Sequence, residues 1–386
     1  MGVALGLVAG CGDDSTTTGP SSSSSSAGGA GGAGGSGGAT SSGGGGAAGT
    51  TEIQIVDLGM PIDLTPDGSV ALIQDATSFE GDVYFYDTAS QEKTLKTQVG
   101  DPSKDISTGI SSTLRVSAIH GVPALAGIFS DPGGWLDLTS PYPTNCDPDV
   151  SGAFDISADG KVAVGLLWNG CNAEAFRWSD TGGAGTVTPL ELIGDSPSGT
   201  PANRASVVSD DGKVAAGFAQ HGNVDRSPAI WAENGTGTLL DPTNTDTPGE
   251  ILSITADGAA LGGITGYDGF RWTQADGIVP LARLETSLPS DPTFTNAIAA
   301  HGELIFGAVG DAFNGIPVAF VWTQAGGSKS LQDIALANGL MIPEGFSMTN
   351  VLAASDDGSV VLGTLTSENL EIKTFVLKLP VSAYGL

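Results

Sequence analysis

The segment ISADGKVAVGLLWNG, residues 156–170, has a form that recurs along the chain. In it the turn pair Asp159-Gly160 is followed by apolar residues that alternate with others from Val162 to Leu166. Asp-Gly next to alternating apolar residues is the strongest short signal for a β-hairpin, and we expect a type I′ turn, which needs positive φ. Each segment of this form therefore predicts two antiparallel strands joined by a tight turn.

The turn pair returns at regular intervals after residue 51. The seven pairs are Asp67-Gly68, His120-Gly121, Asp159-Gly160, Asp211-Gly212, Asp257-Gly258, His301-Gly302 and Asp357-Gly358. The turn glycines have a mean spacing of about 48 residues, and strand-rich repeats of roughly 40 to 50 residues indicate the blades of a β-propeller. His120 and His301 stand where the other units have Asp, so we interpret both as turn variants.

Each unit has further shared features that give it four strands. A glycine follows the turn glycine by five positions in five units, at Gly165, Gly217, Gly263, Gly307 and Gly363. A glycine at a fixed place in a strand indicates a bulge or a close backbone approach. An aromatic strand comes next, as in AFRW at 175–178 and GFRW at 269–272, and its side chains are expected to pack between blades. A last strand with Leu completes a four-stranded blade.

The two ends of the repeat region complement each other. The last unit stops after its third strand, EIKTFVLKL, and the segment before the first turn, EIQIVDLG, has the form of a fourth strand. Pairing of these strands would protect two open sheet edges. We therefore predict an all-β, seven-bladed β-propeller over residues 51–386, closed by strands from both termini. SLQDIALANGL shows the one trace of helical spacing, and we expect a single loose turn there.

The unit resembles the HAF-type extracellular repeat of secreted bacterial proteins. In that family an apolar-Asp-Gly-apolar-Gly segment precedes an Ala-Phe-x-Trp strand and an Asp-Leu-Gly ending, and the resemblance covers roughly residues 52 to 386. The resemblance implies a β-propeller and export, and it supplies no catalytic residues.

The start of the chain resembles that of a bacterial lipoprotein. Residues Val3 to Ala9 form an apolar run of the length of a signal-peptide core, and Val8-Ala9-Gly10-Cys11 is similar to a lipobox. The resemblance implies lipidation of Cys11 and cleavage of a signal segment at 1–11. Residues 12–50 are almost entirely Gly, Ser, Ala and Thr, a composition typical of a disordered tether. We expect a bacterial envelope protein, periplasmic or at the cell surface, held to a membrane by its lipid.

Charge narrows the possible partners. The chain has 14 Lys and Arg against 43 Asp and Glu, a formal net charge of −29. Such a surface repels nucleic acid and anionic membrane faces. We expect a monomer that binds an unknown protein or glycan at the cell surface.

The sequence leaves open whether the chain has a disulfide and whether it binds Ca²⁺. Cys146 and Cys171 form an even pair in an exported chain, which predicts a disulfide, the alternative being two buried thiols. CDPDVSG, at 146–152, begins like a Ca²⁺ loop, but Ala158 stands where the bidentate Glu would be. We expect no cofactor, with Ca²⁺ as the one possibility.

No catalytic residues can be assigned from the sequence, and two functions are open. The first is a non-catalytic binding or scaffold module, and the second is a propeller hydrolase or lyase acting on polysaccharide, which would need carboxylates that meet along the central axis. The loops between the second and third strands vary while the strands repeat, so they are the candidate contact surface. The candidate ligand-binding residues in these loops are Trp168, His221, Tyr267 and Phe313.

Overall fold

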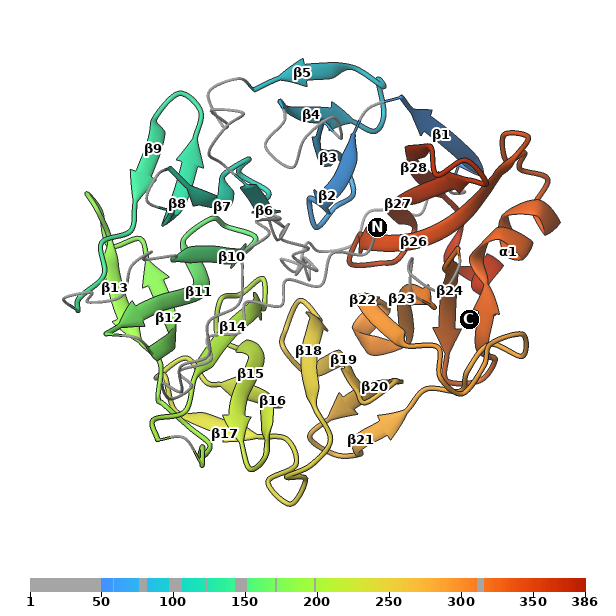
Figure 1. The fold of residues 1–386 in the computed structure, drawn as a ribbon. Helices are drawn as coiled ribbons and strands as arrows, with labels where there is room; N and C mark the ends of the chain where they lie inside the picture. The colour runs from blue at the N-terminus through green and yellow to red at the C-terminus, as the bar shows by residue number, and fades with distance from the viewer. Residues whose placement is uncertain are drawn as a thin grey trace, which may run out of the picture.

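The computed structural model shows seven four-stranded antiparallel sheets arranged as a ring (Figure 1). It describes residues 50–57, 59–75, 82–96, 106–121, 124–142, 151–170, 172–197, 199–310 and 316–386. The predicted all-β, seven-bladed propeller is confirmed. Among the described residues no helix is both long and apolar enough to span a membrane.

The strands of each blade follow one another from the centre of the ring outward. Blade 1 holds β2 (Met60–Leu64), β3 (Val70–Gln74), β4 (Val83–Asp87) and β5 (Lys93–Leu95). Blade 2 holds β6 (Ile106–Ile110), β7 (Val116–His120), β8 (Leu125–Ser130) and β9 (Gly134–Asp137). Blade 3 holds β10 (Gly152–Ile156), β11 (Val162–Asn169), β12 (Asn172–Ser179) and β13 (Thr186–Pro189). Blade 4 holds β14 (Asn203–Val208), β15 (Ala215–His221), β16 (Val224–Trp231) and β17 (Gly237–Leu239).

The remaining three blades follow the same order. Blade 5 holds β18 (Gly249–Ile254), β19 (Ala260–Thr265), β20 (Asp268–Thr273) and β21 (Gly277–Pro280). Blade 6 holds β22 (Thr293–Ala299), β23 (Leu304–Val309), β24 (Val318–Thr323) and β25 (Gly327–Ser330), with the short η1 (Ala300–Gly302) in its first turn. Blade 7 holds β26 (Phe346–Ala354), β27 (Val360–Ser367), β28 (Ile372–Lys378) and β1 (Glu52–Val56), and η2 (Val381–Tyr384) follows it.

The N-terminal strand closes the ring. β1 pairs antiparallel with β28 from Glu52↔Lys378 to Val56↔Thr374. Lys378 Nζ lies 2.9 Å from Glu52 Oε1, and Gln54 Nε2 donates to the carbonyl of Thr88 in blade 1 at 2.7 Å. The predicted closure by strands from both termini is therefore confirmed.

The Asp-Gly turns have a different geometry from the one expected. Gly68 has φ of 73°, and Asp67 is not among the residues with positive φ. Gly68 N donates to Thr65 O at 2.7 Å, while Asp67 Oδ1 accepts from Thr65 Oγ1 at 2.8 Å and from Ser69 N at 3.0 Å. The expected type I′ turn is wrong, because the aspartate is fixed by its own side-chain hydrogen bonds and only the glycine takes the left-handed conformation.

The glycine five positions after the turn glycine lies opposite a bulge in the innermost strand. The innermost strand of every blade has a register shift against the second strand. Blades 1 and 2 have this shift with Ile73 and Ala118 at the position of the glycine. In the other five blades a carbonyl oxygen of the innermost strand lies so close to the glycine that a Cβ would overlap it. The distances from such a Cβ to the facing oxygen are 2.0 Å at Gly165, 2.2 Å at Gly217, 2.5 Å at Gly263, 1.8 Å at Gly307 and 2.2 Å at Gly363.

Blade 2 departs from the expected boundaries. Its first turn runs from Ser111 to Arg115, with Leu114 at φ of 59° and Leu114 N donating to Ser111 O at 3.0 Å. His120 instead ends β7, where its ring stacks on Trp135 with centroids 4.0 Å apart. The assignment of His120-Gly121 as the first turn is therefore wrong, because Ser-Thr-Leu makes that turn without an Asp-Gly pair. His301, by contrast, lies in the first turn of blade 6 as expected.

The core lies between the blades. Phe176, Trp178 and Trp231 are fully buried, as the repeating aromatic strands predict. SLQDIALANGL forms the helix α1 (Leu331–Ala337), longer than the single turn expected. Ser330 caps it by accepting from Asp333 N at 3.2 Å, and its apolar face joins the core.

Backbone hydrogen bonds link the first turns of neighbouring blades around the axis. In five of the seven first turns, one residue donates its N–H to the carbonyl of the equivalent residue in the next blade. The bonds run from Ser112 to Ala158 at 2.9 Å, Ala158 to Asp210 at 3.3 Å, Asp210 to Ala256 at 3.0 Å, Ala300 to Asp356 at 2.7 Å and Asp356 to Pro66 at 2.9 Å. Pro66 has no N–H to continue the ring. The residues of these turns are thus held at one end of the propeller.

Candidate functional site

The repeat lets the seven innermost strands be compared position by position. One position of the innermost strand pairs with a residue of the second strand, namely the residue that follows the position of Gly165 in blade 3 and its equivalents in the other blades. This position lies at the end of the propeller that carries the variable loops, called the loop-bearing end below. Its occupants are Met60, Ile106, Gly152, Arg204, Glu250, Phe294 and Asn350. Because five blades pack with uncharged residues there, the propeller does not need the two adjacent charges, and Arg204 and Glu250 need another explanation.

Arg204 and Glu250 belong to a charge cluster that also contains Arg226. Arg204 Nη2 donates to Glu250 Oε1, Arg226 Nη1 donates to Glu250 Oε2 at 2.7 Å, and Ser206 Oγ donates to Glu250 Oε1 at 2.8 Å. The guanidinium carbons of Arg204 and Arg226 lie 4.9 Å and 4.8 Å from the centroid of the Phe218 ring. Two cations and one carboxylate give this cluster a net charge of about +1 in an acidic protein.

Burial and charge decide the ionisation of Glu250. The exposed fractions of the side chains are 7% for Glu250, 12% for Arg204 and 27% for Arg226. Burial raises the pKa of the Glu250 carboxyl, and the two guanidinium groups lower it by more, so its pKa lies below the usual range. The cluster therefore stays charged, and Arg226 is its most accessible member.

Two buried carboxylates lie on innermost strands, one position after the bulge. Asp63 Oδ2 accepts from Ile110 N of blade 2 at 2.9 Å, and Asp155 Oδ2 accepts from Val208 N of blade 4 at 2.7 Å. Each carboxylate thus joins its blade to the next one. Burial raises the pKa of Asp63 to about 7, and burial together with the Asp63 charge raises the pKa of Asp155 well above its usual range.

Two more carboxylates lie in the first turns of blades 4 and 7. Burial, with the charges of Asp356 and then Asp155 and Asp63, raises the pKa of Asp210 to about 9. Burial and the charges of Asp357 and Asp67 raise the pKa of Asp356 to about 7. Carboxyl groups with such pKa values hold protons near neutrality and could exchange them with a ligand. Within the described ranges, no three His, Cys, Asp or Glu side chains group closely enough to hold a metal ion.

Three of the four candidate ligand-binding residues lie at the loop-bearing end, where they were expected. Trp168 is only 8% exposed and packs beside Phe154 and Leu166. His221 Nδ1 lies 2.5 Å from Asp195 Oδ1, and its Nε2 lies 3.0 Å from the Pro242 carbonyl oxygen. Tyr267 is 59% exposed, in the turn between β19 and β20. The three side chains therefore differ in how accessible they are to a ligand: Tyr267 is largely exposed, whereas Trp168 is almost completely buried.

The other candidate residues lie outside the described residues. These are Phe313, the lipidation candidate Cys11, the proposed disulfide partners Cys146 and Cys171, and the acidic residues Asp147 and Asp149 of the possible Ca²⁺ loop. Their assignments stay predictions.

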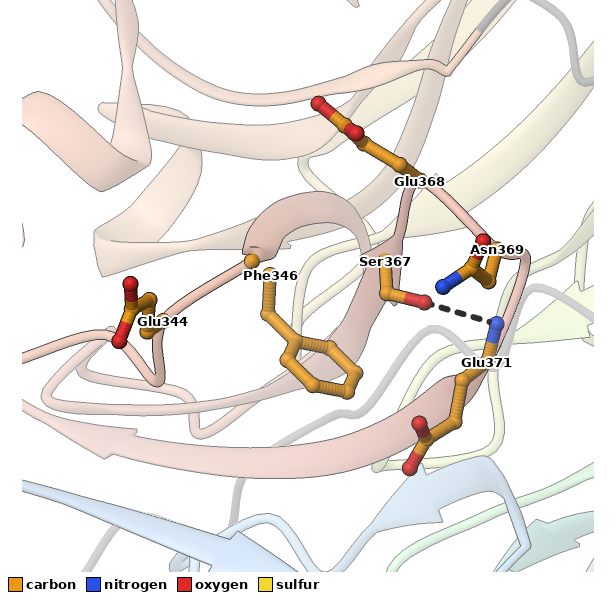
Figure 2. Close-up of a pocket in the computed structure, with 7 residues that line it drawn as sticks. Glu344, Phe346, Ser367, Glu368, Asn369 and Glu371 are labelled. Carbon is orange, nitrogen blue, oxygen red and sulfur yellow. Dashed lines mark hydrogen bonds between the residues drawn. The ribbon is translucent and has the colours of Figure 1, made fainter.

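A cavity with a volume of about 220 Å³ lies on blade 7, beside the turn between β27 and β28 (Figure 2). Glu344, Phe346, Glu368 and Glu371 are among the residues that line it. Figure 2 shows the three glutamate carboxylates directed away from one another, so they do not converge on one ligand atom. Lys373 Nζ, which lies 3.6 Å from Glu371 Oε1, also lies 5.2 Å from the Phe346 ring centroid. The cavity is thus lined by acidic side chains that do not form a catalytic arrangement.

The sequence interpretation missed the charge cluster and the four carboxylates with raised pKa values, Asp63, Asp155, Asp210 and Asp356, here called the axial carboxylates. A signal was present, since PANRASVV and GEILSI place a charge at the same repeat position, where the other units have none. The significance of that position depends on the bulge and the pairing register, which the sequence pattern did not reveal.

The comparisons with known proteins support the fold and indicate no function. No family model and no curated protein matches the chain. Virginiamycin B lyase from Staphylococcus aureus has a TM-score of 0.54 and 15% identity, over 86% of this chain and 100% of that one. Oligogalacturonate lyase from Vibrio parahaemolyticus has a TM-score of 0.55 and 12% identity, over 86% and 93%. The β-propeller domain of Swd1 from Myceliophteria thermophila has a TM-score of 0.55 and 9% identity, over 86% and 100%. The chain is a seven-bladed β-propeller structurally related to virginiamycin B lyase and similar propellers, and at these identities the likeness shows the fold alone.

Proposed function

We propose that this chain is an exported, lipid-anchored β-propeller that binds a protein or glycan at the cell envelope without catalysing a reaction. The observation that carries the proposal is the Arg204–Glu250–Arg226 cluster at the loop-bearing end. Five other blades show that the fold forms without charges at the Arg204 and Glu250 position. A rigid, partly exposed charge cluster beside variable loops is the kind of surface that recognition requires.

The location in the proposal rests on the sequence. Val8-Ala9-Gly10-Cys11 supports a lipid anchor, and residues 12–50 support a flexible tether. A tether of this length has a typical end-to-end distance of about 34 Å, which would hold the propeller clear of the membrane. We propose that the blades are HAF-type repeats, on the strength of the recurring Asp-Gly and Phe-x-Trp segments. Mass spectrometry of membrane fractions should find diacylglycerol on Cys11, and recovery of soluble, unmodified chain from the native host would contradict the anchor.

The binding proposal is tested with the full chain carrying Cys11→Ser, which removes the lipid site. We expect this protein to be captured by an immobilised envelope protein or glycan, and Arg226→Ala to weaken capture about tenfold. The matched control is Lys213→Ala, since Lys213 is an exposed cation paired with Asp211 at the opposite end. Equal capture by the Arg226 variant and the parent would contradict the role of the cluster.

The second candidate function is a polysaccharide hydrolase or lyase, and the axial carboxylates are the observation that favours it. The raised pKa values of Asp63, Asp210 and Asp356 would suit groups that donate or accept protons near neutral pH. Incubation with polysaccharides, followed by reducing-end and double-bond assays, tests this candidate. Product formation that Asp210→Asn abolishes would favour the enzyme over the binding module.

A further inference from the structure

Two large apolar side chains stand out of the loop-bearing end of blades 5 and 6. Tyr267 is 59% exposed and Leu288, in the connection between β21 and β22, is 63% exposed. Single exposed apolar residues are common in soluble proteins and need no explanation. The hydrogen bonds of the backbone at Tyr267 and Leu288 indicate that these two exposed side chains belong to one fixed surface.

Arg283 holds both residues in place through one guanidinium group. Its Nη2 donates to Tyr267 O at 3.2 Å, and its Nη1 donates to Leu288 O at 3.0 Å and to Asp291 O at 2.7 Å. Its Nε donates to Asp268 Oδ1 at 2.9 Å. Leu288 N in turn donates to Asp291 Oδ2 at 2.7 Å. The loops that carry Tyr267 and Leu288 are thus fixed before any partner arrives, which lowers the entropy cost of binding.

Blade 6 has further exposed aliphatic side chains at the same end of the propeller. Thr293 N donates to Tyr267 O at 3.0 Å, and Gly310 N donates to Pro292 O at 2.9 Å, so the loops of blades 5 and 6 lie side by side. Ile316 and Val318, at the start of the third strand of blade 6, are 41% and 37% exposed. A surface with the single aromatic ring of Tyr267 beside the aliphatic Leu288 suits a protein side chain better than a sugar face, which prefers aromatic platforms.

Charge identifies the kind of partner. Asp268 Oδ1 accepts from Arg283, Asp291 Oδ2 accepts from Leu288 N, and Glu285 lies on the same connection as Leu288. With Arg283 as the one cation, these four residues have a net charge of about −2. The whole chain carries −29, which would attract a cationic segment and repel an acidic one.

We propose that the Tyr267–Leu288 patch, formed by these two side chains and the carboxylates of Asp268, Glu285 and Asp291, docks a positively charged segment of a partner protein. An apolar side chain of that segment packs against Tyr267 and Leu288, and its Lys or Arg side chains pair with these carboxylates. The inference rests on the proposed binding function and names the class of partner.

The test uses the full chain with Cys11→Ser and an array of short synthetic peptides that combine Lys or Arg with Leu or Phe. Matched peptides carry Glu in place of Lys and Arg, and a glycan array is probed in parallel. We expect binding to the basic peptides that weakens as salt rises, and Tyr267→Ser or Leu288→Ser to weaken it about tenfold. Both side chains are exposed, so the melting temperature should not change.

Met341→Ser is the matched control, since Met341 is 84% exposed in the connection between α1 and β26 of blade 7. Equal weakening by this control, or equal binding of the acidic peptides, would overturn the proposal. Capture by a glycan with no peptide binding would also overturn it and leave the proposed binding function standing. Failure to bind either array would count against both.

Discussion

Substitution of a single repeat glycine tests the account of the blade most directly. In Gly307→Ala the new Cβ would lie 1.8 Å from Phe294 O and 2.9 Å from the carbonyl carbon of the same residue. The obstacle is backbone in the bulged innermost strand, so it cannot move aside as a flexible side chain can. Overpacking of this kind costs about 3 kcal/mol, and the loss of glycine's freedom in the unfolded chain returns about 0.5 kcal/mol.

The expected loss in the free energy of unfolding is therefore about 2.5 kcal/mol. Unfolding entropy is about 2.1 cal/mol/K per residue, or about 0.7 kcal/mol/K over the roughly 340 residues of the repeat region, so the melting temperature should fall by about 3 to 4 °C. Differential scanning calorimetry measures this shift. Gly133→Ala is the control, because its nearest contacts would be an ordinary 3.5 Å and 3.6 Å from Ser130. A fall below about 1 °C, or an equal fall in the control, would refute the close approach of Phe294 O as the reason for the glycine.

Four further outcomes are expected. Deletion of residues 52–58 removes β1 from β28 and should lower the melting temperature sharply, whereas unchanged stability would argue against closure. Because the pKa of Asp210 is raised to about 9 in the folded state, its contribution to stability is fully present below its unfolded pKa of about 4 and is lost as pH rises through 9. The melting temperature should therefore fall from pH 5 to pH 9.5, with a flatter profile in Asp210→Asn; a rising profile would show the sign to be wrong. Because Trp168 is only 8% exposed, Trp168→Ala should lower the free energy of unfolding by about 3 to 5 kcal/mol. A variant as stable as the parent would show that the ring lies outside the core. A Cys146–Cys171 disulfide would leave neither thiol open to iodoacetamide without reductant, and alkylation of both would show that it is absent.

The sequence by itself determined the all-β class, the seven blades and the terminal closure. These features depend on local signals that each blade repeats, namely a turn glycine with positive φ, an alternating strand and an aromatic strand. Repetition averages out the local exceptions, so the blade count survived the wrong boundary at His120, where Leu114 makes the turn instead. The order of strands also follows the chain, which leaves few alternatives for pairing.

Only the tertiary structure decided which residues could act together. Arg204 and Glu250 are 46 positions apart, and their contact depends on the register of two separate sheets and on how closely neighbouring blades pack. The same is true of Asp63 and Asp155, each of which accepts a backbone N–H from the following blade. A carboxylate in the sequence has an ordinary pKa until the fold fixes its burial and its neighbours. Hydrophobic period and turn chemistry are local and can be read along the chain, whereas contacts between blades and burial near the axis arise only when the ring is closed.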